Sequence, residues 1–307
     1  MKKMVIAGGT GFLGQILAEY YKNKYETIFI LSRRKKDSNG NINYVQWDGK
    51  SKGSWFSHLE NADVLINLTG KSVDCRYNEK NKTAILNSRV DATEILGHAI
   101  RICDNPPKVW LNSSTATIYR HSMDKEMDEE TGEIGTGFSV SVATSWEESF
   151  FSQITPKTRK VALRTAIVLG KKGGSLKPIV NLVKAGLGGK QGSGDQYFSW
   201  LHEDDFANAI EYIISNKHLD GVFNLVAPKP ATNKQLMGRI RYLLKIPFGM
   251  PLPKWLLEIG AIMIRTETEL VLKSRRVIPK RLMDEGYSFK YGDLTKCMNH
   301  LLLNKKK

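Results

Sequence analysis

Three glycines near the N-terminus have the spacing of a phosphate-binding turn. Gly8, Gly11 and Gly14 lie in KMVIAGGTGFLG, where an apolar run enters the turn and a helical pattern leaves it. The first glycine permits a tight turn, the second lets the backbone approach a pyrophosphate, and the third lets the helix pack closely on the sheet. The helix N-terminus also offers free N–H groups to phosphates. We therefore predict a dinucleotide site made by these glycines together with Thr10, Phe12 and Leu13.

The residues after the second apolar run bear on the choice between NAD and NADP. An Asp or Glu about 20 residues after such glycines usually holds the ribose 2′-hydroxyl of NAD. This chain instead has Ser32, Arg33 and Arg34 in LSRRKK. A guanidinium binds a 2′-phosphate well, whereas a carboxylate would repel it. The pattern favours NADP(H), and the alternative is that both arginines are solvated surface residues.

Two more strand ends carry candidate cofactor contacts. Asp48, in VQWDG after a possible third strand, could accept a hydrogen bond from an adenine amino group or could simply form a turn. The stretch NLTG ends a fourth strand at the carboxyl edge, where ligands of such sheets lie. Small residues there let the backbone pass close to a ligand. We include Leu68, Thr69 and Gly70 in the predicted cofactor site.

The bulk composition excludes several other classes of protein. The chain of 307 residues has 46 Lys and Arg against 31 Asp and Glu, a formal charge of +15. The basic residues are scattered and form no stripe with interleaved aromatics, so we expect no nucleic-acid partner.

Three cysteines lack metal-ligand or disulfide spacing, which favours a reducing cytoplasm and no metal site. The N-terminus shows no signal-peptide pattern. The most hydrophobic stretch, 255–264, is too short to span a bilayer. We therefore interpret it as a buried helix and expect no membrane partner.

The elements that would position these residues alternate along the chain. Apolar runs typical of buried strands alternate with helical patterns, which predicts a doubly wound parallel sheet with helices on both faces, an α/β fold. The strand runs cover 4–8, 27–32, 62–70, 108–114, 160–169 and 221–228, and the helical patterns cover 14–24, 81–103, 141–154 and 231–244. Glycine-rich loops begin after residue 170. We divide the chain into a dinucleotide-binding domain, 1–170 and 198–228, and a smaller, mostly helical C-terminal lobe, 171–197 and 229–307.

Taken together, these stretches resemble the extended short-chain dehydrogenase/reductase superfamily. GGTGFLG, ADVLINLTG, NSSTATIY and FSWLHEDD occur in its order, and FNLVAPKPATN and VIPKRLMDEGYSF are similar to an atypical epimerase-like subgroup, the YfcH/SDR39U1 type. The resemblance covers almost the whole chain. It implies a Rossmann fold, NADP binding and an undefined small-molecule substrate. It also implies cofactor contacts at positions that match those of relatives, namely Ser32, Arg33, Leu68, Thr69 and Arg89.

The resemblance also indicates that this chain lacks the Tyr and the Lys that the superfamily uses for catalysis. Superfamily members transfer hydride with a Ser or Thr that orients the substrate, a Tyr that acts as acid and base, and a Lys that lowers the pKa of the Tyr. Thr115 takes the Ser/Thr position, with Ser113 and Ser114 as alternatives that could also merely end a strand; we add Ser113 to the predicted cofactor site. Alignment places Ser139 at the Tyr position and Ala143 at the Lys position. Neither side chain titrates usefully near neutral pH.

Possible substitutes for the Tyr are few. Tyr119 follows Thr115 closely and is a candidate that could face the cleft. His202 could titrate, but a hydrogen-bonded structural role is the favoured interpretation. Asp205 is interpreted as a helix cap. The only Tyr-x-x-x-Lys, Tyr20–Lys24, lies on the first helix and is a chance match.

Two functional hypotheses follow. The first is an NADP-dependent oxidoreductase or epimerase that acts on an unidentified small molecule with unusual acid/base residues. The alternative is a catalytically silent NADP(H)-binding sensor or assembly protein that kept the cofactor turn and lost the chemistry. The sequence does not indicate an oligomeric state.

Overall fold

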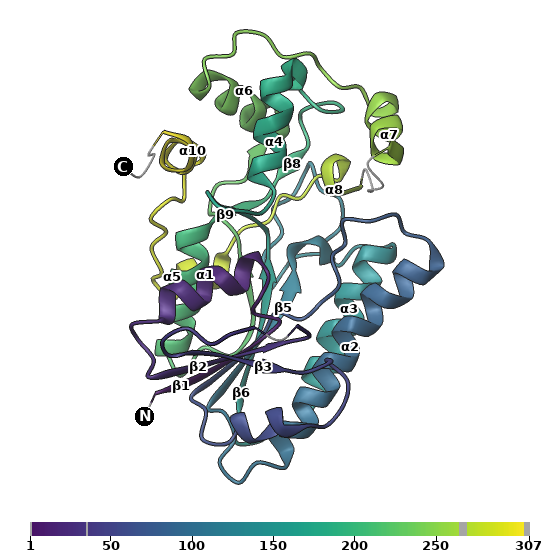
Figure 1. Cartoon of the computed structure of the whole chain (residues 1–307). Coiled ribbons are helices and arrows are strands. Elements are labelled where there is room, and N and C mark those ends of the chain that lie inside the picture. Colours follow the sequence, from purple (N-terminus) through teal and green to yellow (C-terminus); the bar gives the residue numbers. More distant parts are fainter. Residues whose placement is uncertain (1, 35, 264–268, 304–307) are drawn as a thin grey trace.

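A seven-stranded parallel sheet forms the centre of the molecule (Figure 1). The computed structural model describes residues 2–34, 36–263 and 269–303. The strand order is β10-β6-β5-β4-β1-β2-β3, and every neighbouring pair is parallel. The strands are β1 (Lys3–Ala7), β2 (Thr27–Ser32), β3 (Ile42–Gln46), β4 (Val64–Asn67), β5 (Val109–Thr115), β6 (Arg159–Thr165) and β10 (Gly221–Leu225). The predicted α/β, Rossmann-like doubly wound sheet is confirmed.

Helices cover both faces of this sheet, so its strands are apolar on both sides. In β1, Met4 and Ile6 belong to one core cluster, and Val5 and Ala7 belong to another. Helices α1 (Phe12–Tyr21) and α5 (Glu203–Ser215) lie on the first side, and α2 (Glu79–Arg101) and α3 (Phe138–Phe151) lie on the second (Figure 1). Burial on both faces explains the continuous hydrophobic runs in the sequence.

The run 160–169, expected as one strand, is two strands. It breaks at Ala166 between β6 and β7 (Ile167–Leu169). The N–H of Ala166 still donates to Leu225 O of β10 at 3.0 Å, but β7 leaves the sheet and pairs with β9 (Trp200–His202). The chain thereby passes from the sheet into the C-terminal part, and it returns through β9 into α5.

The C-terminal part packs around its own apolar cluster, which includes Trp200, Leu236 and Met298. Thr232 caps α6 with a capping box, in which its hydroxyl accepts from Gln235 N and the Gln235 side chain accepts from Thr232 N. The expectation of a buried helix at 255–264 is wrong where its side chains are described, because Trp255 is 62 % exposed; residue 264 lies outside the described residues. The elements of this part are α4 (Leu176–Leu182) with a π turn (Val183–Leu187), β8 (Tyr197–Phe198), β11 (Ala231–Thr232), α6 (Asn233–Leu243), α7 (Lys254–Met263), α8 (Glu269–Leu272), α9 (Lys280–Asp284) and α10 (Leu294–Leu302).

A short extended stretch, residues 274–278, joins the two parts and is called the junction segment below. Its backbone bonds to the loop around Ser122 on one side and to the strand around Tyr197 on the other. The N–H of Arg275 donates to Tyr197 O at 3.0 Å, and the N–H of Ile278 donates to Met127 O at 2.9 Å. The junction segment is therefore held between chain regions that are distant in sequence.

Two short 3-10 helices, Ser54–His58 and Ala116–Ile118, complete the described elements. Within the described part of the chain, no helix is both long and apolar enough to cross a membrane.

Candidate functional site

The strand order places a ligand crevice beside the glycine turn. β1 lies between β2 and β4, so the chain connections run in opposite directions on either side of it. Ligands of open parallel sheets bind at the carboxyl ends of the strands at such a switch point. Gly8 follows β1, and Leu68 follows β4 on the other side of the crevice. The fold therefore brings the predicted cofactor residues of both strand ends together.

The glycines of the turn have two different roles, close packing and access for a ligand. Gly8 has φ +72°, and a Cβ there would lie 2.9 Å from the backbone of Thr69. A Cβ on Gly14 would lie 2.3 Å from Gly9 Cα. A Cβ on Gly11 would meet nothing closer than Gly8 O at 3.9 Å. Gly8 and Gly14 are thus required for packing, whereas Gly11 faces open space, as a residue that approaches a pyrophosphate must.

The N-terminus of α1 suits a phosphate. Its cap residue is Gly11, and no side chain within the described residues accepts a hydrogen bond from the first turn. Such N–H groups and the helix dipole favour an anion. Thr10 and Phe12 lie in or directly after the turn, and Leu13 lines the pocket described below. The residues present therefore fit a dinucleotide.

The two arginines lie next to this turn. The N–H of Gly8 donates to Leu31 O at 3.0 Å, which holds the end of β2 against the turn. Ser32 is buried, and its hydroxyl donates to Arg34 O at 2.7 Å. Arg33 and Arg34 are both exposed. The hydrogen bond of Ser32 thus stabilises the bend after β2. This bend exposes the guanidiniums of Arg33 and Arg34 to solvent, where they could bind a 2′-phosphate.

Asp48 forms a turn, which was one of its two interpretations. Its Oδ1 accepts the N–H groups of Lys50 and Ser51, each at 2.8 Å. The hydrogen bonds from Ser51 and then from Lys50 lower the pKa of Asp48 to about 2. Because Oδ1 accepts hydrogen bonds from its own loop, only Oδ2 is left for a contact with adenine. This contact stays a prediction.

A pocket of about 340 Å³ extends from the turn along the carboxyl ends of β4, β5 and β6. It is lined near the turn by Leu13, Leu68 and Gly70, and farther along by Ser113, Thr115, Ser139 and Ala143. Thr69, from the predicted cofactor set, is half-buried and is not among the lining residues. The pocket thus joins five of the fifteen predicted cofactor residues to the positions where the superfamily has its catalytic residues. The five are Leu13, Leu68, Gly70, Arg89 and Ser113.

Arg89 lies in the wall of this pocket. Its Nη1 donates to the carbonyls of Lys71 at 3.1 Å and Ile85 at 2.9 Å, and its guanidinium lies 5.1 Å from the Trp146 ring centroid. Burial lowers the pKa of Arg89 to about 10, so it remains charged at neutral pH. A Cβ on Gly70 would lie 3.0 Å from Arg89 Cζ, so Gly70 makes room for this side chain. A half-buried cation that has no carboxylate partner among the described residues suits an anionic cofactor.

The three hydroxyls at the end of β5 differ in role. Ser113 and Thr115 line the pocket, and Thr115 Oγ1 accepts the N–H of Thr117 at 3.1 Å. Ser114 also borders the pocket, but its hydroxyl donates to Glu147 Oε1 at 2.5 Å. Ser114 is therefore committed to the protein interior, and Thr115 and Ser113 remain the hydroxyls that can orient a substrate.

Below these hydroxyls lies a buried hydrogen-bond network that we call the polar floor, made of Ser114, Tyr119, Glu147, Arg164 and Asn224. Arg164 forms a bidentate ion pair with Glu147, with Nε–Oε1 at 2.9 Å and Nη2–Oε2 at 2.8 Å. Burial opposes the charge of Arg164, but the hydrogen bonds and charge of Glu147 prevail and raise its pKa. The charged pair is thereby fully partnered.

The expectation that Tyr119 faces the cleft is wrong. Its side chain is fully buried and lies in the polar floor, where its hydroxyl accepts from Arg164 Nη1 at 2.9 Å and donates to Asn224 Oδ1 at 3.0 Å. Burial raises the pKa of Tyr119, so the phenol keeps its proton at neutral pH. A tyrosine without access to the pocket cannot replace the missing acid/base.

Ser139, which occupies the position of the missing Tyr, has a hydrogen-bond partner that the sequence analysis did not identify. Ser139 lines the pocket, and its hydroxyl donates to Glu269 Oε2 at 3.0 Å. Ala143 is fully buried in the pocket wall. Glu269, at the start of α8, is 130 residues away from Ser139 in sequence, so no local pattern could have paired them. The Tyr20–Lys24 match spans the end of α1, since Tyr20 lies in the helix and Lys24 lies in the turn after it, with Lys24 Nζ 3.9 Å from the Tyr20 ring centroid.

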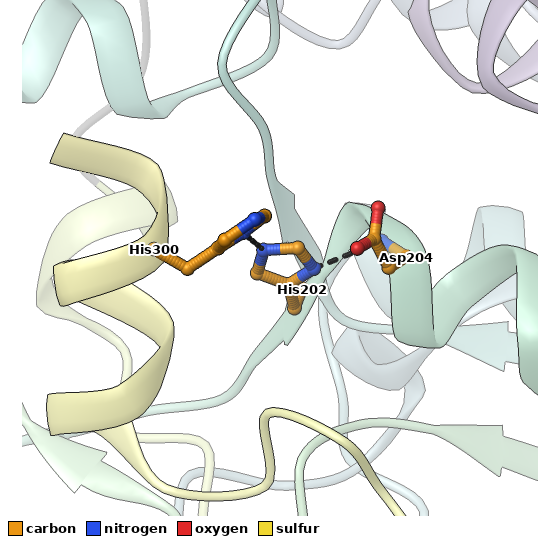
Figure 2. A group of neighbouring side chains, drawn as sticks. All are labelled: His202, Asp204 and His300. Carbon is orange, nitrogen blue, oxygen red and sulfur yellow. Dashed lines mark hydrogen bonds between the residues drawn. The ribbon is translucent and has the colours of Figure 1, made fainter. Parts of the chain in front are cut away.

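His202 has the structural role that was favoured for it. Figure 2 shows it between Asp204 and His300. Its Nδ1 accepts the N–H of Asp204 at 2.9 Å, which caps α5, and its Nε2 lies 2.9 Å from His300 Nδ1. Burial first, and then the charge of neighbouring groups, lower the pKa of His202 to about 3. Ligand atoms of the three residues lie within 4.8 Å of one another, as in a metal site. Both ring nitrogens of His202 are committed, however, so the geometry is that of a helix cap.

Asp205 was expected to cap a helix, and that expectation is wrong. It lies in the first turn of α5, and its carboxylate accepts the N–H groups of Lys290 at 2.9 Å and Tyr291 at 2.8 Å. His202 already occupies the cap position, so the Asp205 carboxylate instead fastens the loop that precedes α10.

Known proteins share both parts of this chain. The model of the NAD dependent epimerase/dehydratase family matches residues 4–225, and that of a domain of unknown function, DUF1731, matches residues 252–301. The epimerase family protein YfhF of Bacillus subtilis is 32 % identical, over 99 % of each chain.

Solved structures give the same picture. The human epimerase family protein SDR39U1 (isoform 2), crystallised with NADPH, superposes with a TM-score of 0.87 at 29 % identity, covering 99 % of this chain and 100 % of that one. A nucleoside-diphosphate sugar epimerase from Corynebacterium glutamicum has a TM-score of 0.77 at 25 % identity, covering 98 % of this chain and 58 % of that one. The resemblance drawn from the sequence motifs is confirmed. The chain belongs to the NAD dependent epimerase/dehydratase family, in the group of epimerase family proteins that carry the DUF1731 domain.

Proposed function

We propose that this chain binds NADP(H) and works as an oxidoreductase or epimerase on an unidentified small molecule. Three features support the cofactor: the glycine turn with open space above Gly11, the exposed Arg33 and Arg34 beside it, and the NADPH bound by the human relative. Gly11 and the N-terminus of α1 would hold the pyrophosphate, and Leu68, Gly70 and Arg89 would line the path to the nicotinamide end.

The observation that carries the catalytic part is the hydrogen bond between Ser139 and Glu269 in the pocket. When bound, the nicotinamide accepts or donates a hydride. Thr115 would orient a substrate hydroxyl, Ser139 Oγ would take its proton, and Glu269 Oε2 would receive the proton from Ser139. Lys273 Nζ lies 3.6 Å from Glu269 Oε1 and would pair with this carboxylate. The alcohol would thus lose its proton to Glu269 and a hydride to the bound cofactor, and would become a carbonyl.

The test is a substrate screen with matched variants. NADP(H) absorbance is followed with sugar nucleotides, ketones and alcohols, using the native chain, Glu269→Gln and Glu258→Gln. Glu258 is an exposed glutamate on the neighbouring α7 and serves as the control. We expect Glu269→Gln to lower kcat by about 100-fold or more, because proton transfer contributes that much, with an unchanged Kd for NADPH. Turnover that survives Glu269→Gln unchanged would remove Glu269 from the mechanism.

A second candidate is the silent NADP(H)-binding sensor or assembly protein. The loss of the Tyr and Lys at Ser139 and Ala143 favours it. NADPH binding without turnover of any compound in the screen would support this function. A substrate whose turnover disappears in Thr115→Ala would reject it, because a binding protein has no use for a substrate-orienting hydroxyl.

A further inference from the structure

The positive charge of the chain is concentrated in the C-terminal part. Residues 171–197 and 229–258 contain eleven Lys and Arg but only two acidic residues, Asp195 and Glu258. Eleven charges less two leave nine of the fifteen net positive charges of the chain, in less than one fifth of its length. A charge excess of this kind on one part of a molecule favours an anionic partner.

One stretch of this part, residues 237–257, has an unusual composition and is called the tip segment below. Its sequence MGRIRYLLKIPFGMPLPKWLL contains apolar residues, glycine, proline, one tyrosine and four cations. It contains no acidic residue and no Ser, Thr, Asn, Gln or His. The segment runs from α6 through a loop into α7, at the end of the molecule opposite the N-terminus (Figure 1).

Large apolar side chains of the tip segment are exposed to solvent. The four that are between 46 % and 72 % exposed lie within 14 residues of one another in sequence and are Tyr242, Phe248, Met250 and Trp255. Single exposed apolar residues are normal, but a group of them marks an interaction site. A groove of about 420 Å³ beside Tyr242 is also lined by the side chains of Arg241 and Lys245. Cations and exposed apolar groups therefore share this end of the molecule.

The loop of the tip segment is held by its backbone. The N–H of Met250 donates to Gly186 O at 2.8 Å, and the N–H of Leu252 donates to Lys190 O at 2.9 Å. These bonds fasten the loop to the turn that follows α4. The backbone pairing thus occupies the inner side of the loop, while Phe248 and Met250 stay exposed. Lys190 adds a further exposed cation beside the loop.

The composition of the tip segment separates the candidate partners. A second copy of this chain would place the same cations opposite each other in a symmetric contact, and like charges repel. A nucleic acid offers phosphates, but its bases are read by amide and hydroxyl side chains, which this segment lacks, and it has no apolar interior for Phe248 and Met250. An anionic bilayer offers phosphates at its surface and hydrocarbon beneath, and these match both kinds of side chain.

We propose that the tip segment docks on the surface of an anionic lipid bilayer. Lys245 and Lys254 would lie at the level of the lipid phosphates, and Phe248 and Trp255 would enter the boundary between headgroups and acyl chains. The protein would lie on the membrane without crossing it. This proposal departs from the expectation of no membrane partner, which came from the length of the stretch 255–264. Length decides whether a helix can span a bilayer, and a surface contact does not require it.

The test measures binding to vesicles and does not depend on turnover. The native chain is floated with vesicles of phosphatidylcholine alone, or of phosphatidylcholine mixed with an equal amount of phosphatidylglycerol. We expect binding to the anionic vesicles only, and weaker binding as salt is added. Lys245→Gln/Lys254→Gln should raise the Kd for lipid by at least about tenfold, since each cation near the surface contributes about fivefold. Phe248→Ser/Trp255→Ser should also raise it by at least about tenfold, because two aromatic side chains no longer leave water.

Two matched controls change exposed residues outside the tip segment. Lys52→Gln/Lys217→Gln removes the same number of charges, and Ile102→Ser/Ile154→Ser removes exposed apolar surface. Both should bind anionic vesicles as the native chain does. All the substituted side chains are exposed, so we expect the native thermal midpoint and the native Kd for NADPH in every variant.

Three results would overturn the proposal: no binding of the native chain to anionic vesicles, equal binding to both kinds of vesicle, or equal losses in the tip and control variants. Without vesicle binding, binding of polyuridine RNA that Lys245→Gln/Lys254→Gln abolishes would assign the tip segment to a nucleic acid instead. A dimer in light scattering that Phe248→Ser/Trp255→Ser converts to a monomer would assign it to a second copy of this chain.

Discussion

The two ends of the pocket differ in the chemical groups that form them. The glycine turn is formed by backbone N–H groups and by residues that leave no space for a side chain, since Gly8 and Gly14 cannot accommodate a Cβ. The polar floor is formed by buried charged side chains, with Arg164 and Glu147 in a bidentate pair. A backbone cradle fits any dinucleotide and says little about the reaction. The side chains at the other end decide the chemistry, and here they differ from the Tyr and Lys of the superfamily.

Breaking the ion pair of the polar floor should have the largest effect. In Arg164→Met, Glu147 would be left as an unpaired buried carboxylate, which costs about 3–5 kcal/mol of folding free energy. Urea unfolding measures this loss. The double variant Arg164→Met/Glu147→Met removes both charges, and we expect it to recover much of the stability. A single variant as stable as the native chain would show that the polar floor is not what supports this end of the pocket.

The glycine turn should separate folding from binding. Gly14→Ala forces a Cβ against the backbone of Gly9 and should destabilise the fold by about 1–3 kcal/mol, the usual cost of overpacking. Gly11→Ala has room for its methyl group and a φ of −77°, so it should fold normally. Its methyl group would lie where the pyrophosphate approaches, so NADPH binding should be lost. Calorimetric titration and thermal unfolding of both variants give the answer; full NADPH affinity in Gly11→Ala would contradict the cradle.

The arginines beside the turn should set the preference for NADP(H). We expect Arg33→Ala/Arg34→Ala to weaken NADPH binding by about tenfold to 100-fold through the loss of charge-assisted hydrogen bonds to the 2′-phosphate, with little change for NADH. The native difference between the two cofactors should also shrink as salt is added. Lys217→Ala, on the loop after α5, is a control for loss of surface charge. Equal affinity of the native chain for NADPH and NADH would remove the argument.

The smallest effect is a pH dependence from His202. Its folded pKa of about 3 lies below the usual 6.5, so the unfolded chain binds the proton first as pH falls. Stability contributed by the neutral ring is therefore present above pH 6.5 and is lost below it, by about 1.4 kcal/mol for each pH unit. His202→Asn keeps a capping side chain without titration. The stability advantage of the native chain over this variant should fall by about 1.4 kcal/mol between pH 7.5 and 5.5.

An advantage of the native chain that stays constant over this range would contradict the neutral cap. The groups around the ring are identical in both proteins, so their own titration cancels to first order. They are Asp204 and His300 of the cap, together with Lys171, Lys290 and Tyr291.

Local patterns were enough to predict the parallel sheet and the place of the glycine turn. The glycine turn and the strand that ends at Ser32 each lie within a few residues of chain, where spacing and residue type carry the information. The division of the chain into two lobes, and the individual cofactor contacts, stay predictions.

The other end of the pocket could not be read in this way. Ser139 meets Glu269, and Arg164 meets Tyr119, through contacts between distant parts of the chain. Such pairs depend on the path of the whole chain, and a lone Tyr, Glu or Arg looks the same in a core, at a surface or in a site. For this reason Tyr119 was wrongly expected to face the cleft, and Glu269 was not identified from the sequence.

The route of the chain through the polar floor has a consequence for biosynthesis. Glu129 accepts the N–H groups of Asn224 at 2.8 Å and Arg281 at 3.3 Å, and the amide of Asn224 donates to Ile278 O at 2.9 Å. A ribosome must therefore release residues near the C-terminus before the first half of the protein gains its last hydrogen bonds. Until then the nascent chain carries an incompletely paired interior, a state prone to aggregation. Premature termination before residue 278 should thus destabilise the first part of the protein, as well as remove its last domain.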